Sequence, residues 1–226
     1  TSIHYEQIFS QLKGIGINED KIEQYIHQTN NIDLYGQKLA LKNILHLVSK
    51  RPLDINIETY SFCPLKCSFC CNRIYQREKK LMDLRLFTKI IEEYITIWNG
   101  GTLSIGAMQS DFLSDPLLLE RLAIIRKYKE KIYLYSTTPL ISLTKYNDRD
   151  VQYILETFDY LQISVEGYDS YTYFLMSGVD GFNVFQNQLK RIYRIINDNQ
   201  LNIRIELYFR VQNAFEAVQS DFFKWC

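Results

Sequence analysis

The stretch that decides the fold is Leu53–Cys71, LDINIETYSFCPLKCSFCC, which joins a strand-like segment to a cluster of cysteines. Apolar and polar side chains alternate over 53–60, as they do along a β-strand with one buried face. Cys63, Cys67 and Cys70 follow closely, and Cys71 comes directly after them. A disulfide framework spreads its cysteines to join distant segments, whereas cysteines this close together indicate metal ligation in a reducing compartment.

Downstream of this stretch, segments with strand and helix periodicity alternate along the chain. Such alternation is typical of a parallel sheet with right-handed helical crossovers, either doubly wound or rolled into a barrel. Five strands are too few for a closed barrel of eight. The expected strands are 53–60, 102–106, 131–136, 160–165 and 202–211, the expected helices are 84–98, 116–129, 149–157 and 182–197, and a further helix is expected to start near Asn213.

The segment before the first strand has a different pattern. Residues 1–52 carry apolar side chains at the three- and four-residue spacing of helices. We therefore expect a helical N-terminal segment over 1–52, followed by the α/β core over 53–226. The segment is expected to pack on the core, and a peptide- or partner-binding module is the alternative.

Composition excludes several classes of protein. The chain has 226 residues, of which 46% are hydrophobic and 23% charged, which favours a globular core over disorder. The 26 basic and 26 acidic residues balance, so there is no electrostatic reason to expect a nucleic acid or an anionic membrane as partner. No apolar run approaches the roughly 20 residues that span a bilayer. We therefore expect a soluble, cytoplasmic protein.

The cysteine loop has two readings as a metal site. Three thiolates can hold three irons of a cubane [4Fe–4S] cluster and leave the fourth iron open to a small molecule. Cys71 is an unfavourable fourth ligand, because adjacent cysteines point in divergent directions. Zinc held by three cysteines and a histidine is the alternative. It is disfavoured because His4, His27 and His46 all lie in the N-terminal segment.

The C-x3-C-x2-C spacing, with the aromatic Phe69 before its last cysteine, resembles the signature of the radical S-adenosylmethionine (radical SAM) enzymes. The resemblance implies a partial (β/α) barrel of parallel strands, which in this chain is expected to be truncated after the fifth strand. It also implies a [4Fe–4S] cluster on Cys63, Cys67 and Cys70, and S-adenosylmethionine with its adenine against Phe69. The implied reaction is reductive cleavage of S-adenosylmethionine to a 5′-deoxyadenosyl radical that abstracts a hydrogen atom from a C–H bond. An external electron donor such as a flavodoxin or ferredoxin would be needed.

Two further features are similar to one subgroup of that family, which often bears a C-terminal SPASM extension. They are the Ser-x-Glu-Gly sequence at 164–167 and the helix start at Met82–Asp83. No such extension is visible. Members of the subgroup modify ribosomal peptides, mature sulfatases or act on sugars, so a peptide substrate is expected. The alternative is a catalytically degenerate iron–sulfur or zinc-binding scaffold.

The resemblance also assigns polar residues at the strand ends to the cofactor. Ser110 and Asp111 stand where relatives have a Gly-Asp pair that meets the methionine amino group, although Asp111 can instead start a turn. Thr137 matches the first residue of a Thr-Asn-Gly sequence. Ser164 and Glu166 resemble the family's Ser-x-Asp-Gly sequence, which meets the ribose or the methionine carboxylate.

One arginine of the family pattern is missing. Ser177 stands where relatives carry the arginine of a Tyr-x-x-x-Arg-Gly sequence, and a lost guanidinium removes a bidentate clamp on a carboxylate. Arg204 is assigned to the cofactor in its place, with Arg210 as the other candidate. The polar side chains of this fifth strand share one face, which predicts either the wall of a polar cavity or an edge strand with one wet face. They are Arg204, Glu206, Tyr208 and Arg210.

Overall fold

The computed structural model describes Pro52 and residues 54–75, 77–106 and 110–226. The helical segment expected over 1–52 lies outside the described residues, apart from Pro52. Within the described ranges, no helix is both long and apolar enough to cross a membrane.

Five parallel strands form one sheet, and they lie side by side in the order of the sequence. Asp54 pairs with Thr102 at one edge of the sheet, and Ser164 pairs with Tyr208 at the other. Because each new strand is added at the same edge, the sheet winds in one direction, as in a barrel and not as in a doubly wound fold. The predicted α/β partial barrel is therefore confirmed. The strands are β1 (Asp54–Ile57), β2 (Gly101–Ile105), β3 (Ile132–Thr138), β4 (Tyr160–Val165) and β5 (Arg204–Phe209).

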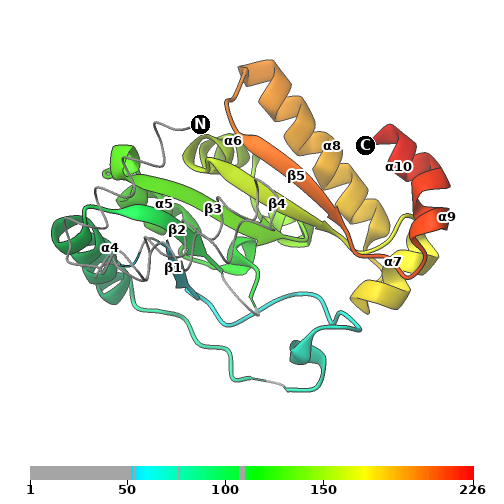
Figure 1. The fold of residues 1–226 in the computed structure, drawn as a ribbon, viewed down its shortest axis with the longest axis horizontal. Coiled ribbons are helices and arrows are strands. Elements are labelled where there is room, and N and C mark those ends of the chain that lie inside the picture. Colours follow the sequence, from blue (N-terminus) through cyan, green and yellow to red (C-terminus); the bar gives the residue numbers. More distant parts are fainter. Residues whose placement is uncertain (1–51, 53, 76, 107–109) are drawn as a thin grey trace, which may run out of the picture. The chain divides into compact units, whose positions relative to one another are not determined.

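Helices connect the strands and bury one face of the sheet. Leu103, Leu134 and Ile163 are fully buried in one apolar cluster with side chains of the connecting helices. Figure 1 shows α4 beside β2 and α8 along β5. The helices are α4 (Leu84–Trp98), α5 (Leu118–Arg126), α6 (Asp148–Thr157), α7 (Ser170–Ser177), α8 (Phe182–Asn199), α9 (Ala214–Gln219) and α10 (Asp221–Trp225), with short 3₁₀ turns η1 (Cys71–Arg73), η2 (Phe112–Ser114), η3 (Lys129–Lys131) and η4 (Ile141–Lys145).

The opposite face of the sheet is polar, since side chains alternate between the two faces of each strand. Asn56 is in register with Ser104, and Ser104 with Tyr135. The Tyr135 hydroxyl donates a hydrogen bond to Asp54, at 3.3 Å. A row of polar groups thus crosses three strands, which is a surface suited to a ligand with hydrogen-bonding groups.

The starts of two expected helices can be compared with the structure. Helix α4 begins at Leu84 as expected, and Asp83 caps it, because its carboxylate accepts hydrogen bonds from two backbone N–H groups of the first turn. Helix α5 begins at Leu118, later than predicted. Asp115 instead accepts from the N–H of Leu117, at 2.8 Å, and from the Arg121 side chain, at 2.8 Å. The carboxylate therefore closes a turn before the helix starts.

Helix α7 was not expected from the sequence. Its segment is apolar nearly all round, so it lacks the one-sided pattern that marks an amphipathic helix. The signal that was available is a capping box. Asp169 accepts from the N–H of Thr172, at 2.7 Å, and the Thr172 hydroxyl accepts from the N–H of Asp169, at 3.1 Å.

Candidate active site

The cysteine loop leaves the carboxyl end of β1 and is held against the end of α7. The backbone N–H of Lys66 donates to the carbonyl of Ser177, and that of Ser68 donates to the carbonyl of Met176, both at 2.8 Å. The last carbonyls of a helix have no partner inside the helix, so the loop satisfies them. A helix that sequence reasoning missed therefore fixes the loop in place.

Gly178 makes this close contact possible. It ends α7 in the left-handed region, with φ at 72°, where a residue without a Cβ is unstrained. A Cβ at this position would lie only 2.8 Å from the carbonyl oxygen of Lys66. Glycine is thus required both by the turn and by the loop that packs on it.

Three thiols open on one cavity of about 400 Å³ at the carboxyl ends of the strands. These are the thiols of Cys63, Cys67 and Cys70, and Phe69 lies among them; Cys71 is exposed and does not line the cavity. Strand-end residues complete the wall. They include Ser110, Thr137, Ser164 and Arg210, with Asn56, Ser104 and Tyr135 from the polar row of the sheet.

The thiols of Cys63 and Cys67 are poorly solvated. None of the cysteines forms a disulfide. Burial, together with neighbouring carboxylates and thiols, raises the pKa of Cys63 and of Cys67 to about 12, so without a metal both stay protonated at neutral pH. Metal binding would deprotonate them, because the thiolate is the ligand.

The donor set fits an iron–sulfur cubane better than a single ion. Among the described residues, no group of three or more His, Cys, Asp or Glu side chains converges on a single-ion site. Each thiolate of a cubane binds a different iron, so the three sulfurs need not converge on one point.

Glu166 and Arg210 form a charged pair, of which Arg210 lines the cavity and Glu166 does not. A guanidinium nitrogen of Arg210 lies 3.6 Å from Glu166 Oε1, and the guanidinium lies 5.5 Å from the centre of the Phe69 ring. Burial raises the pKa of Glu166 to about 7, while Arg210 lowers it. Glu166 Oε2 is buried and has no hydrogen-bond partner among the described residues, so this carboxyl can still accept a hydrogen bond.

Asp111 has a different environment from the one its assignment suggests. It caps η2 and accepts hydrogen bonds from the Thr138 hydroxyl, at 2.9 Å, and from the N–H of Leu113, at 3.3 Å. Burial raises its pKa, and it does not line the cavity, whereas Ser110 next to it does. In the structure Asp111 therefore starts a turn, which is the alternative stated from the sequence.

Arg204 lies away from the cavity. Its side chain is mostly exposed and pairs with Glu206 on the same strand. Arg210, six residues along the same face, is the arginine that reaches the cavity. The polar groups of Ser104 and Tyr135 also line it and were not assigned. Their signal in the sequence is a polar residue at every second position of a buried strand.

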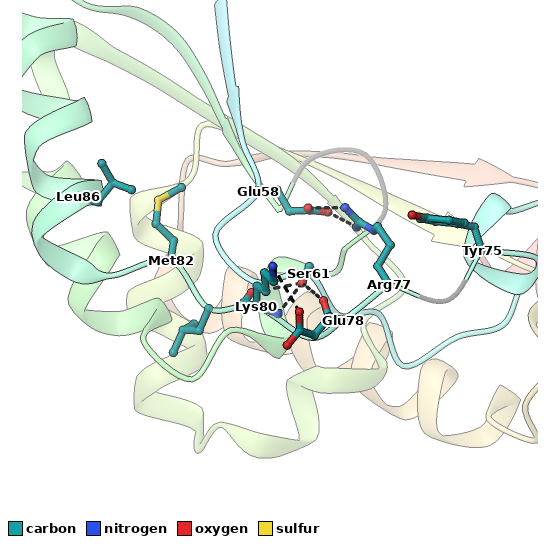
Figure 2. A pocket seen from close by; sticks show the side chains of 9 residues that line it. Glu58, Ser61, Tyr75, Arg77, Glu78, Lys80, Met82 and Leu86 are labelled. Atoms are coloured by element: carbon teal, nitrogen blue, oxygen red, sulfur yellow. Dashed lines mark hydrogen bonds and ion pairs between the residues drawn. The ribbon is translucent and has the colours of Figure 1, made fainter.

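A second cavity, of about 510 Å³, lies beside the loop and has no cysteine in its wall. In it, Arg77 forms two hydrogen bonds with Glu58, of 2.8 and 2.6 Å (Figure 2). Ser61 accepts from the N–H of Lys80, at 2.7 Å. These contacts join residues 77–80, at the end of the loop, to residues 58–61, which follow β1. They hold the two ends of the loop together, and we assign this cavity a structural role.

The comparisons with known proteins agree with this geometry. The family model described as the Radical SAM superfamily matches residues 57–205. The solved structure of BtrN in complex with AdoMet and 2-DOIA is 15% identical, with a TM-score of 0.51, over 70% of this chain and 56% of that one. The structure of anSMEcpe with bound AdoMet and Cp18Cys peptide is 16% identical, with a TM-score of 0.53, over 69% of this chain and 42% of that one. No curated protein sequence matches.

These likenesses have a stated extent. The chain spans about half the length of the solved proteins it resembles. At identities this low, the TM-scores show a shared fold and nothing more specific. The family model covers more than half of the chain. The enzymes of that family use a [4Fe–4S] cluster and S-adenosylmethionine, which is the ligand set that the cysteine loop fits. This chain therefore belongs to the radical SAM superfamily.

Proposed function

We propose that this chain binds a [4Fe–4S] cluster through Cys63, Cys67 and Cys70 and uses it with S-adenosylmethionine for radical chemistry. The observation that carries the proposal is that these three thiols, and not Cys71, open on one cavity with Phe69 among them. The cavity lies at the carboxyl ends of parallel strands, where α/β folds place their ligands.

A cluster held by these cysteines would supply the electron for reductive cleavage of S-adenosylmethionine, the source of the 5′-deoxyadenosyl radical for hydrogen abstraction from a C–H bond. The chain's own residues bind and orient the cofactor. The ring of Phe69 offers a stacking face to the adenine. The hydroxyl-bearing residues Ser110, Thr137 and Ser164 also line the cavity.

The pair of Arg210 and Glu166 suits the amino-acid end of the cofactor. Arg210 presents a guanidinium to a carboxylate, and the unpartnered oxygen of Glu166 can accept a hydrogen bond from an ammonium or a ribose hydroxyl. In this proposal Arg210 takes the role that the sequence assigned to Arg204. Asp111 acts as a positioning residue, since its capped turn holds Ser110 at the cavity.

A peptide is the substrate class that we propose. One solved relative was crystallised with a peptide as well as AdoMet. The cavity continues from the cysteines to Asn56, Ser104 and Tyr135, whose amide and hydroxyl groups can pair with a peptide backbone. The free thiols of the loop are consistent with a reducing compartment such as the cytoplasm.

The experiment is anaerobic reconstitution with iron and sulfide, followed by assay with dithionite and S-adenosylmethionine. We expect about four irons per chain, as the cubane formula requires, and release of 5′-deoxyadenosine. Cys70→Ser should abolish that release. Cys71→Ser is the matched control, because it removes the neighbouring thiol that does not line the cavity, and it should retain activity.

Three outcomes would contradict the proposal. Stoichiometric zinc with no iron would support the zinc scaffold. An intact cluster without 5′-deoxyadenosine would support the degenerate scaffold, to which Ser177 in place of an arginine would then be the clue. Equal losses of 5′-deoxyadenosine release in the Cys70→Ser and Cys71→Ser variants would show that lining the cavity does not distinguish the cluster ligands from Cys71.

A further inference from the structure

Tyr173 on α7 has a buried hydroxyl group that the proposed function does not use. The side chain is fully buried, and its hydroxyl has no hydrogen-bond partner among the described residues. Buried polar groups in native proteins nearly always have a partner, so such a group points to a ligand or a functional role. The centre of its ring lies 5.7 Å from that of the Phe185 ring and 5.9 Å from that of Phe182. This packing fixes the ring, and with it the direction of the hydroxyl.

The helix that carries Tyr173 contacts two parts of the candidate site. At its start, α7 packs on Gly167, where a Cβ would lie only 2.3 Å from the backbone nitrogen of Tyr173. Gly167 directly follows Glu166 in the sequence. At its end, α7 holds the cysteine loop through the N–H groups of Lys66 and Ser68. Along the helix, Tyr173 therefore lies between the end of β4 and the loop that bears the cysteines.

The groups that act electrostatically on this hydroxyl include two of the proposed cluster ligands. Burial, together with Glu166, Cys67 and Cys63, raises the pKa of Tyr173. The hydroxyl therefore keeps its proton at neutral pH and is available as a hydrogen-bond donor. Glu166 is an acceptor in the same surroundings, but its unpartnered oxygen and the Tyr173 hydroxyl do not bond to each other. The thiols are weak acceptors while they stay protonated.

We propose that the Tyr173 hydroxyl donates a hydrogen bond to a sulfur of the cluster and thereby raises the reduction potential of the cluster. The inference rests on the proposed function and goes beyond it, since neither the cysteine spacing nor the wall of the cavity assigns this residue. Thiolate and sulfide sulfurs carry negative charge, so they accept hydrogen bonds that are stronger than those of neutral thiols. The donor would gain its partner when the cysteines lose their protons to bind iron.

The expected effect on the reduction potential has a definite sign. Reduction adds one negative charge to the cluster, and a hydrogen-bond donor stabilises the more negative form. Hydrogen bonds to the sulfurs are among the factors that set the reduction potential of such clusters. The tyrosine keeps its proton throughout, so no covalent bond forms or breaks in this role. Without the hydroxyl, the cluster should be harder to reduce.

The test is a reductive titration of the reconstituted chain without S-adenosylmethionine, followed by electron paramagnetic resonance of the reduced cluster. The variant is Tyr173→Phe, which keeps the packed ring and removes only the hydroxyl. At a fixed solution potential we expect the ratio of reduced to oxidised cluster to fall about tenfold, which for one electron corresponds to about 59 mV. The iron content should equal that of the unmodified chain. Urea unfolding of the metal-free variant should show no loss of stability, because the hydroxyl that is removed has no partner among the described residues.

The matched control is Tyr94→Phe. Tyr94 is also buried, and its hydroxyl donates to the carbonyl of Thr102, at 3.1 Å, near the start of β2 and at the opposite end of the sheet from the cysteine loop. This variant should leave the reduction potential unchanged.

An unchanged reduction potential in Tyr173→Phe, or an equal shift in both variants, would overturn the inference. Weaker binding of S-adenosylmethionine by Tyr173→Phe at an unchanged potential would also overturn it, because the hydroxyl would then serve Glu166 or the cofactor. If the unmodified chain assembles no reducible cluster, the proposed function fails instead, so the two failures are distinguishable.

Discussion

At the scale of residues, two arginines on one face of β5 have different environments. Arg204 pairs with Glu206 and is mostly exposed, whereas Arg210 lines the cavity and lies between Glu166 and Phe69. Period-two alternation places both on the polar face. Chain direction separates them, because Arg204 is the first residue of β5 and Arg210 follows its last residue, at the carboxyl end where the cavity lies.

Replacing Arg210 should therefore weaken binding of S-adenosylmethionine, and replacing Arg204 should not. A hydrogen bond to a charged group contributes about 1.5–3 kcal/mol, so Arg210→Met should raise the dissociation constant by about tenfold to a hundredfold. Calorimetric titration of the reconstituted protein measures this. Arg204→Met is the matched control, and equal affinities for the two variants would show that Arg210 does not contact the cofactor.

Gly178 gives a second prediction at this scale, on stability. Gly178→Ala places a side chain in the left-handed region and a Cβ against the carbonyl of Lys66, so we expect a loss of about 1–3 kcal/mol. Urea unfolding gives this free energy. Gly181→Ala should cost less, because Gly181 has no positive φ and its nearest neighbour is a flexible side-chain end. Equal costs would mean that the loop does not pack on Gly178 in solution.

At the scale of elements, α5 is anchored by a fully buried arginine. Arg121 pairs with Asp115 at 2.8 Å, donates to the carbonyl of Met82, and lies 4.9 Å from the centre of the Phe87 ring. It thus joins the turn before α5 to the start of α4. In the sequence Arg121 looks like any charged residue of a surface helix, which is why its burial could not be predicted.

Arg121→Met should destabilise the fold by about 3–5 kcal/mol, because it leaves the Asp115 carboxylate buried without its partner. Urea or thermal unfolding measures the change. Arg126→Met on the same helix is the control, since Arg126 pairs with Glu156 at the surface and should contribute about 1 kcal/mol or less. A comparably small effect at both positions would contradict the role given to the buried Arg121–Asp115 pair.

At the scale of the whole molecule, the strands and the longer helices could be predicted because their periodicity is local. The expected strand at 160–165 and the helix at 84–98 have these bounds in the structure. The alternation of strands and helices limited the sheet to a doubly wound or a barrel-like order, but it could not decide between the two. Helix α7 was missed because its segment has no polar face, and with it the contacts that hold the cysteine loop.

In the candidate site, too, features that depend on neighbouring residues could be predicted, and features that depend on distant contacts could not. The cysteine spacing predicted the thiols from neighbouring residues alone, and the structure brings Cys63, Cys67 and Cys70 to one cavity. That Asp111 can start a turn could be stated from the sequence, but its hydrogen bond from Thr138, which is distant in sequence, could not. Contacts of this kind leave no local signal, so they could not be inferred from one sequence.

The central claim is that three cysteine thiolates hold a cubane and leave one iron for the cofactor. The most direct measurement is electron–nuclear double resonance of the reduced, reconstituted protein with S-adenosylmethionine labelled with ¹⁵N at its amino group. The account predicts a ¹⁵N coupling to the cluster that persists in the Cys71→Ser variant. A fully loaded and reduced cluster without any such coupling would contradict it, because no iron would then be open to the cofactor.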